Sequence, residues 1–205
     1  MKQDTFIFIG ISGGGKGTQI ELLKEYIKKN ISESPVFYLE TGKLFREFIK
    51  DETFAAMKAR EVNSRGERQP DFLAIGLWAE LFRKTFNNEE HMIIDGSPRS
   101  VNEAINLDGA LKFLNRERPK VIVLHITPEE CEKRLLLRAK TQGRVDDTIE
   151  GIRKRVEWFE KDVAPAITYY RNNPDYDFIE FDGHGTIEEI HKNIIARVYG
   201  KQVES

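Results

Sequence analysis

Residues 5–19 read TFIFIGISGGGKGTQ, and this stretch decides the fold. A short apolar run rich in isoleucine and phenylalanine leads into a glycine-rich turn, and a pattern typical of a helix follows. The turn fits the phosphate-loop pattern G-x-x-x-x-G-K-[ST] at Gly10, Gly15 and Lys16. Gly17 stands where Ser or Thr is expected, and the hydroxyl comes one residue later, at Thr18. Strand, glycine-rich turn and helix in this order predict a site for nucleotide phosphates rather than a structural turn.

The residue types explain how such a loop binds an anion. Glycines allow backbone N–H groups to converge on phosphate oxygens, and the following helix N-terminus adds partial positive charge. We expect Lys16 to reach the β- and γ-phosphates. We expect Thr18 to face the same anion or its Mg²⁺.

The rest of the chain alternates short apolar runs with longer amphipathic ones. The predicted strands are Thr5–Ile11, Val36–Leu39, His91–Asp95, Val121–Ile126 and Phe178–Phe181. The predicted helices are Gly17–Lys29, Gly42–Lys50, Asp71–Phe86, Val101–Asn115, Pro128–Ala139, Thr148–Arg171 and Thr186–Val198. Pro165 lies inside Thr148–Arg171, so we expect a kink in that helix. Residues 41–70 contain more helix than a crossover needs. This alternation predicts a single α/β domain over residues 1–205, with a doubly wound, five-stranded parallel sheet of the P-loop NTPase type.

Composition limits the class of protein and its partners. The chain has 205 residues, of which 40% are hydrophobic and 32% charged, and its net charge is −2. This balance is typical of a globular protein and gives no general attraction to nucleic acid or an anionic membrane. A single cysteine, Cys131, excludes an internal disulfide and a cysteine-based metal cluster. No signal peptide, membrane span or association element is evident, so we expect a cytoplasmic monomer.

The segment GKGTQ resembles the nucleoside monophosphate kinase family, and its adenylate kinase branch in particular, whose loop reads GxPGxGKGTQ. In that loop Gly follows the lysine, so the late Thr18 is a mark of the family; Ser12 replaces the usual Pro. Three further segments carry the resemblance. LETGKLFRE (39–47) resembles STGDLLR, IIDGSPRSVNEA (93–104) resembles DGFPRTxxQA, and RLLLRAKTQGRVDD (134–147) resembles the short form of the family's lid. No Cys or His cluster accompanies the lid, so a zinc-bearing long lid is excluded.

The resemblance implies a set of site residues and two inserts, an acceptor segment at 40–69 and a short lid at 137–147. The ATP phosphates and base would contact Gly13, Gly14, Gly15, Lys16, Gly17, Thr18, Arg134, Arg138 and Gly185. The acceptor nucleotide would contact Thr41, Arg46, Gly96, Arg99, Glu103, Arg144 and Arg155. The catalytic groups would be Lys16, Arg99, Arg138, Arg144 and Arg155. Thr18 and Asp95 would hold Mg²⁺ through water, although Asp95 could instead cap a helix.

The arginines also make physical sense without the resemblance. Guanidinium groups bind phosphate bidentately and keep their charge when water is excluded. Arg65 and Arg68 fall outside the motifs, and we interpret them as surface residues. No general base is evident, and a monophosphate needs none, because it already carries a charge of about −1.5 to −2. Alignment of two anions and neutralisation of their charge are sufficient.

The acceptor base is the least determined feature. Thr41 matches adenylate kinases, but Glu103 stands where they have Gln. An ionised carboxylate only accepts hydrogen bonds, so it suits the N–H groups of guanine better than N1 of adenine. The reaction we expect is Mg·ATP + AMP giving two ADP, with GMP or a pyrimidine nucleotide as alternative acceptors. The sequence also leaves open a P-loop kinase of a small hydroxyl compound, a nucleotide-binding switch, and a degenerate, inactive kinase.

Overall fold

The computed structural model describes residues 3–142 and 147–200. Its sheet has five strands, all parallel, in the order β2-β3-β1-β4-β5. They are β1 (Thr5–Ile9), β2 (Val36–Glu40), β3 (His91–Asp95), β4 (Lys120–His125) and β5 (Asp177–Asp182). The predicted fold class is confirmed, and the predicted strands differ from these by at most two residues at either end.

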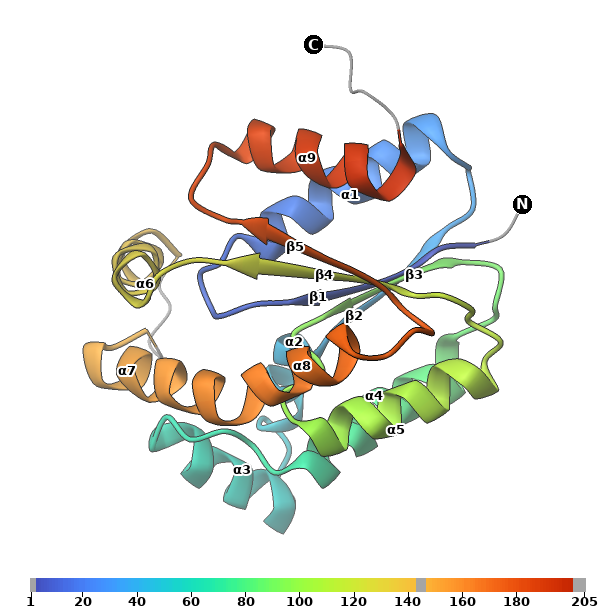
Figure 1. Cartoon of the computed structure of the whole chain (residues 1–205). Helices are drawn as coiled ribbons and strands as arrows, with labels where there is room; N and C mark the ends of the chain where they lie inside the picture. The colour runs from blue at the N-terminus through green and yellow to red at the C-terminus, as the bar shows by residue number, and fades with distance from the viewer. Residues whose placement is uncertain (1–2, 143–146, 201–205) are drawn as a thin grey trace.

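Helices cover both faces of the sheet (Figure 1). One face carries α1 (Lys16–Asn30) and α9 (Ile187–Tyr199), and the other carries α4 (Asp71–Thr85), α5 (Val101–Phe113) and α8 (Ala164–Arg171). Because side chains alternate along a strand, Phe6 and Phe8 pack under the first layer while Ile7 and Ile9 pack under the second. Every residue of β1 is buried, which explains its unbroken apolar sequence.

The strand order places β1 between β3 and β4, so the chain winds outward in both directions from the middle of the sheet. In sheets of this kind, ligands bind beyond the carboxyl ends of the strands, at the point where the winding direction changes. The phosphate loop follows β1, and it therefore lies at this point.

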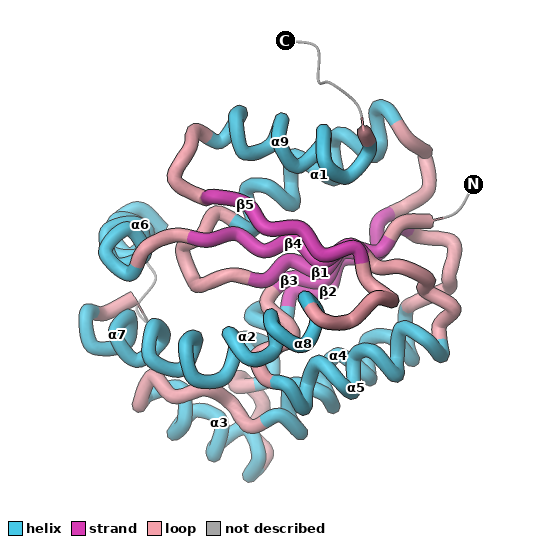
Figure 2. The backbone as a smooth tube through the Cα atoms, in the orientation of Figure 1, coloured by secondary structure: helices cyan, strands magenta, loops and turns pink. Residues whose placement is uncertain are grey.

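The connection from β2 to α4 contains two helices, α2 (Thr41–Phe48) and α3 (Phe54–Ser64). The side chain of Thr53 caps α3 by accepting a hydrogen bond from the backbone N–H of Ala56. Figure 2 shows α3 at the bottom of the view, away from the strands of the sheet. The excess of helix predicted for residues 41–70 is confirmed.

The helix predicted over Thr148–Arg171, with a kink at Pro165, is divided into three parts in the structure. The parts are α7 (Ile149–Trp158), a π-helical turn (Phe159–Val163) and α8. Pro165 has no N–H, and its ring crowds the carbonyl of Lys161, four residues earlier, so the α-helical hydrogen bonding changes just before it. α6 (Pro128–Gln142) follows β4 and packs against α7. None of the helices in the described ranges is long and apolar enough to cross a membrane.

Candidate nucleotide site

The phosphate loop joins β1 to α1 and depends on glycine at two points. Gly15 precedes α1 with a φ of 85°, in the left-handed region that side chains disfavour. At Gly10 a Cβ would lie 2.6 Å from the carbonyl oxygen of Leu124, which is too close for any side chain. By contrast, a Cβ at Gly17 would meet nothing within 4 Å. The space at Gly17 would therefore accept the Ser or Thr of the common pattern.

Lys16 is the first residue of α1, and its side chain turns back over the loop. Its Nζ donates hydrogen bonds to the carbonyl oxygens of Gly10, at 2.8 Å, and Ile11, at 3.0 Å. Burial lowers the pKa of Lys16, the charge of Asp95 opposes this effect, and Arg99 and Arg138 reinforce it. Lys16 thus lies within electrostatic reach of side chains from β3, from the loop before α5 and from α6.

Asp95 ends β3 and pairs in register with Phe8 of β1 and with Glu40 of β2. One carboxylate oxygen accepts a hydrogen bond from the hydroxyl of Tyr38 at 3.1 Å. Ser100 caps α5, since its side chain accepts from the backbone N–H of Glu103. The helix-capping interpretation of Asp95 is therefore wrong.

The residues present suit a magnesium ion held through water. Asp95 offers carboxylate oxygens at the strand end, and Thr18, in the first turn of α1, offers an exposed hydroxyl. Such hard oxygen ligands, few in number, are typical of Mg²⁺, which keeps several waters when it binds with nucleotide phosphates. Within residues 3–142 and 147–200, no three His, Cys, Asp or Glu residues are grouped as a metal cluster would require.

On the proposed ATP side, the loop after β5 lies beside the phosphate loop. Arg134, on α6, donates hydrogen bonds to Gly183 of that loop, at 2.9 Å, and to Gly13 of the phosphate loop, at 3.5 Å. Its Nε also donates to Glu130 at 2.7 Å. Gly185 follows in the same loop, just before Thr186 and Glu189 form a capping box at the start of α9. Arg134 thus links the phosphate loop to the loop after β5, in which Gly185 lies two residues beyond Gly183.

Two further arginines share one buried carboxylate. Asp147 accepts hydrogen bonds from Arg138 of α6, at 2.7 and 2.9 Å, and from Arg155 of α7, at 2.6 Å. Burial alone would raise the pKa of Asp147, but the hydrogen bonds and charges of the two arginines hold it below its usual value. This ion cluster joins α6 to α7. Arg144 lies outside the described residues.

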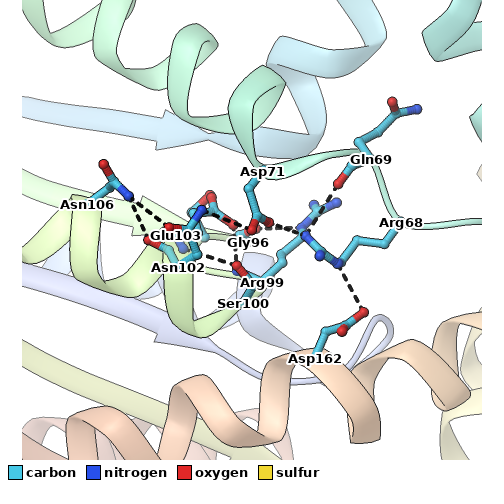
Figure 3. A network of polar contacts seen from close by, with 11 residues as sticks. Arg68, Gln69, Asp71, Gly96, Arg99, Ser100, Asn102, Glu103, Asn106 and Asp162 are labelled. Atoms are coloured by element: carbon cyan, nitrogen blue, oxygen red, sulfur yellow. Dashed lines mark hydrogen bonds and ion pairs between the residues drawn. The ribbon is translucent and has the colours of Figure 1, made fainter.

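On the proposed acceptor side, Arg99 follows β3, and its charge acts on Lys16 of the phosphate loop. Its Nε donates to the carbonyl oxygen of Gly96 at 2.7 Å, and its backbone N–H donates to Glu103 at 2.7 Å. The backbone of Gly96 adopts a φ of 76°. Figure 3 shows these residues together at the start of α5.

Glu103 is fully buried and does not face solvent. Its second oxygen accepts from the hydroxyl of Ser97 at 2.6 Å, and the oxygen of Ser97 lies 2.6 Å from the hydroxyl of Thr41, which is also buried. An ionised carboxylate can only accept, so Ser97 donates to Glu103 and Thr41 donates to Ser97. Thr41 and Glu103, both predicted to contact the acceptor base, are therefore joined through Ser97, which was not among the predicted site residues.

The interpretation of Arg68 as a surface residue is wrong. Its side chain is about one-fifth exposed and makes ion pairs with Asp71 of α4, at 2.5 Å, and Asp162 of the π-helical turn, at 3.1 Å (Figure 3). The sequence analysis missed both pairs. The three-residue spacing of Arg68 and Asp71 at a helix start is a local signal for the first pair, whereas no local signal exists for the second. Arg65, in contrast, is half exposed and pairs with Glu67, as expected of a surface residue.

Several known proteins are similar in sequence to this chain over most of its length. The adenylate kinase family model matches residues 8–174. The adenylate kinase of Flavobacterium psychrophilum is 36% identical over 189 residues, which cover 92% of this chain and 94% of that protein. The adenylate kinase of Azobacteroides pseudotrichonymphae is 33% identical over 92% of this chain and 94% of that protein. The adenylate kinase of Leptospira biflexa is 33% identical over 94% of this chain and 98% of that protein. Since the match spans the phosphate loop, the arginine-bearing helices and the strands between them, this chain belongs to the adenylate kinase family.

Proposed function

We propose that this chain catalyses the reversible, Mg²⁺-dependent transfer of the γ-phosphoryl group from ATP to AMP, which gives two ADP. The observation that carries the proposal is the position of Lys16. It lies at the carboxyl edge of the sheet, on the phosphate loop, with arginines of the acceptor side and of the lid helices within electrostatic reach. Two anions held at this edge would meet beside one lysine.

The chemistry needs alignment and charge neutralisation more than proton transfer. The backbone N–H groups of Gly13 to Thr18 would bind the donor phosphates, with Arg134 and Arg138 beside them. Arg46, Arg99 and Arg155 would hold the acceptor phosphate and the migrating group, and we assign the same role to Arg144. Fixed guanidinium groups stabilise the charge that spreads over the transferred phosphoryl oxygens, so no general base is required.

Mg²⁺ bound with ATP would be held through water by Thr18 and Asp95, and it would neutralise charge on the β- and γ-phosphates. Tyr38 holds one oxygen of Asp95, which fixes the carboxylate at the strand end. We assign residues 40–69 to an acceptor-binding insert and residues 137–147 to a short lid. Closure of such segments would exclude water, which otherwise competes with AMP as the phosphoryl acceptor.

AMP is the acceptor that family membership favours, and Thr41 agrees with it. A guanine base remains the second candidate because Glu103 offers only hydrogen-bond acceptors. In the structure both oxygens of Glu103 already accept hydrogen bonds from protein groups, which weakens the case for guanine.

A coupled assay with ATP and each of AMP, GMP, CMP, UMP and dTMP tests the proposal. We expect AMP to give the highest kcat/KM, ADP alone to disproportionate into ATP and AMP, and chelation of Mg²⁺ to abolish both reactions. Transfer to none of the five nucleotides, with the protein folded and magnesium present, would overturn the proposal.

We further propose that the enzyme is a cytoplasmic monomer. Its one cysteine, Cys131, is buried and unpaired, which suits a reducing compartment. Sedimentation of the purified protein and fractionation of its native cells test the two statements separately.

A further inference from the structure

Glu40 ends β2 in the segment that resembles STGDLLR, at the position where the family has Ser. Its Oε1 lies 2.6 Å from Nη2 of Arg46, the arginine assigned to the acceptor phosphate. We propose that Glu40 competes with the acceptor's phosphate for Arg46 and so weakens binding of the nucleoside monophosphate. This inference rests on the proposed function, because it concerns the acceptor of that same reaction.

The pair is built into the site rather than placed by chance on the surface. Glu40 is held by the sheet, where it pairs in register with Asp95, and it immediately precedes α2, which carries Arg46. Between them lies Gly42, where a Cβ would be 3.0 Å from Nη1 of Arg46 and 3.9 Å from Oε1 of Glu40. The guanidinium therefore lies close against the backbone of Gly42, and the carboxylate lies at its side.

Both partners remain within reach of a ligand. The side chain of Arg46 is 43% exposed and that of Glu40 is 30% exposed. A guanidinium binds a phosphate best through two parallel N–H groups, and Glu40 already uses one nitrogen of the fork. An arriving phosphate must either displace the carboxylate or bind beside it.

Either route weakens acceptor binding. Displacement breaks an ion pair, and binding beside Glu40 brings two like charges close together next to Asp95, which is also acidic. A Ser at position 40 would remove the charge and leave the guanidinium to the phosphate. Since the pair is partly exposed, solvent screening keeps the effect moderate, and we expect it to change the acceptor KM by about three- to tenfold.

The test compares Glu40→Ser and Glu40→Gln with the wild-type enzyme in the coupled assay, with AMP varied at saturating ATP and then the reverse. Both variants should lower the KM for AMP by about three- to tenfold and leave the KM for ATP within about twofold of wild type. Glu47→Ser is the matched control, because Glu47 pairs with Lys50 on the exposed side of the same segment and should change neither constant.

Two results would overturn the inference. An unchanged KM for AMP would mean that Glu40 does not compete, and a higher KM would mean that Glu40 instead orients Arg46 for the phosphate. Combining Glu40→Ser with Arg46→Met checks the route, since the gain from relieved competition should disappear when position 46 carries no cation. Glu40→Gln keeps the shape of the side chain, so it serves if Glu40→Ser does not fold. Failure of the wild-type enzyme to phosphorylate any monophosphate would instead count against the proposed function.

Discussion

Nζ of Lys16 lies 2.8 Å from the carbonyl oxygen of Gly10, so this hydrogen bond joins the two ends of the phosphate loop. Lys16 is also the residue that we propose contacts the transferred phosphate. Lys16→Met removes the charge while keeping an unbranched chain of similar length. We expect kcat to fall by at least about 10²- to 10³-fold, which is the typical cost of losing one group that stabilises transition-state charge. The coupled assay with ATP and AMP measures the change.

Lys28→Met is the matched control, because Lys28 is an exposed residue in the last turn of the same helix. It should leave kcat unchanged, and both variants should keep the circular dichroism spectrum of the wild type. Wild-type turnover in a folded Lys16→Met protein would contradict the role assigned to Lys16.

Glu103→Gln tests whether the buried carboxylate stabilises the loop between β3 and α5, binds the acceptor base, or does both. Its two oxygens accept from the Ser97 hydroxyl and from the backbone N–H of Arg99. A Gln side chain has only one oxygen, so its amide group would face one of these two donors. We expect the free energy of unfolding to fall by about 1–3 kcal/mol, measured by urea denaturation.

The same variant should raise the ratio of kcat/KM for AMP to that for GMP if Glu103 also reaches the base, since an amide can donate to N1 of adenine. An unchanged ratio would show that Glu103 supports the loop only. Glu157→Gln, on the exposed side of α7, is the control and should change neither measurement.

The sequence predicted those parts of the structure whose causes are local. β1 and the phosphate loop follow from an apolar run and from glycines at positions where a side chain would collide or strain the backbone. The three parts of residues 149–171 were only partly predictable, because Pro165 indicates a disturbed helix but not a π-helical turn. The phosphate-loop pattern predicted Lys16 and Thr18, and the resemblance to the family supplied the other site residues.

Contacts between distant segments could not be predicted in this way. Arg68 and Asp162 are separated by 94 positions, and no local pattern indicates that they pair. The hydrogen-bonded surroundings of Glu103 include Ser97, in the loop after β3, and Thr41, at the start of α2 after β2. These two residues meet because β2 and β3 are neighbours in the sheet. Burial of a charged residue is a property of the packed structure. From sequence alone, a glutamate such as Glu103 is expected at the surface, in contact with solvent.

Arg68→Met tests whether the ion pairs of Arg68 stabilise the contact between the segment before α4 and the π-helical turn. Loss of Arg68 leaves the partly buried carboxylates of Asp71 and Asp162 without their cation. We expect the free energy of unfolding to fall by about 1–3 kcal/mol, measured by urea denaturation.

Arg65→Met is the control for Arg68, because the Arg65–Glu67 pair is exposed and its loss should not measurably change stability. An Arg68→Met variant as stable as the wild type would mean that the ion pairs with Asp71 and Asp162 contribute nothing to folding.

His91 makes the stability of the fold depend on pH. It is buried, its Nδ1 accepts a hydrogen bond from the backbone N–H of Asp4 at 3.0 Å, and its Nε2 lies 3.2 Å from the hydroxyl of Ser32. Burial lowers its pKa from the ordinary value of 6.5, the charge of Asp4 opposes this, and Arg116 and Lys120 lower it further. The folded protein therefore resists protonation of His91 more strongly than the unfolded chain does.

The sign of the effect follows from this difference. Above pH 6.5 both states keep His91 neutral, and its contribution to stability is fully present. As the pH falls below 6.5 the unfolded chain takes up the proton first, so stability decreases until the pH reaches the lowered pKa of the folded state. One such proton changes the free energy of unfolding by at most about 1.4 kcal/mol per pH unit.

His91→Asn removes the titrating group but keeps an oxygen that can accept from Asp4. Urea denaturation of both proteins from about pH 7.5 to about pH 5.5 should show a smaller loss of stability in the variant than in the wild type. Some loss should remain, because burial also lowers the pKa of His191, with Glu25 opposing the shift. If the His91→Asn slope matches the wild type, His91 titrates alike in both states and its burial does not make the fold sensitive to acid.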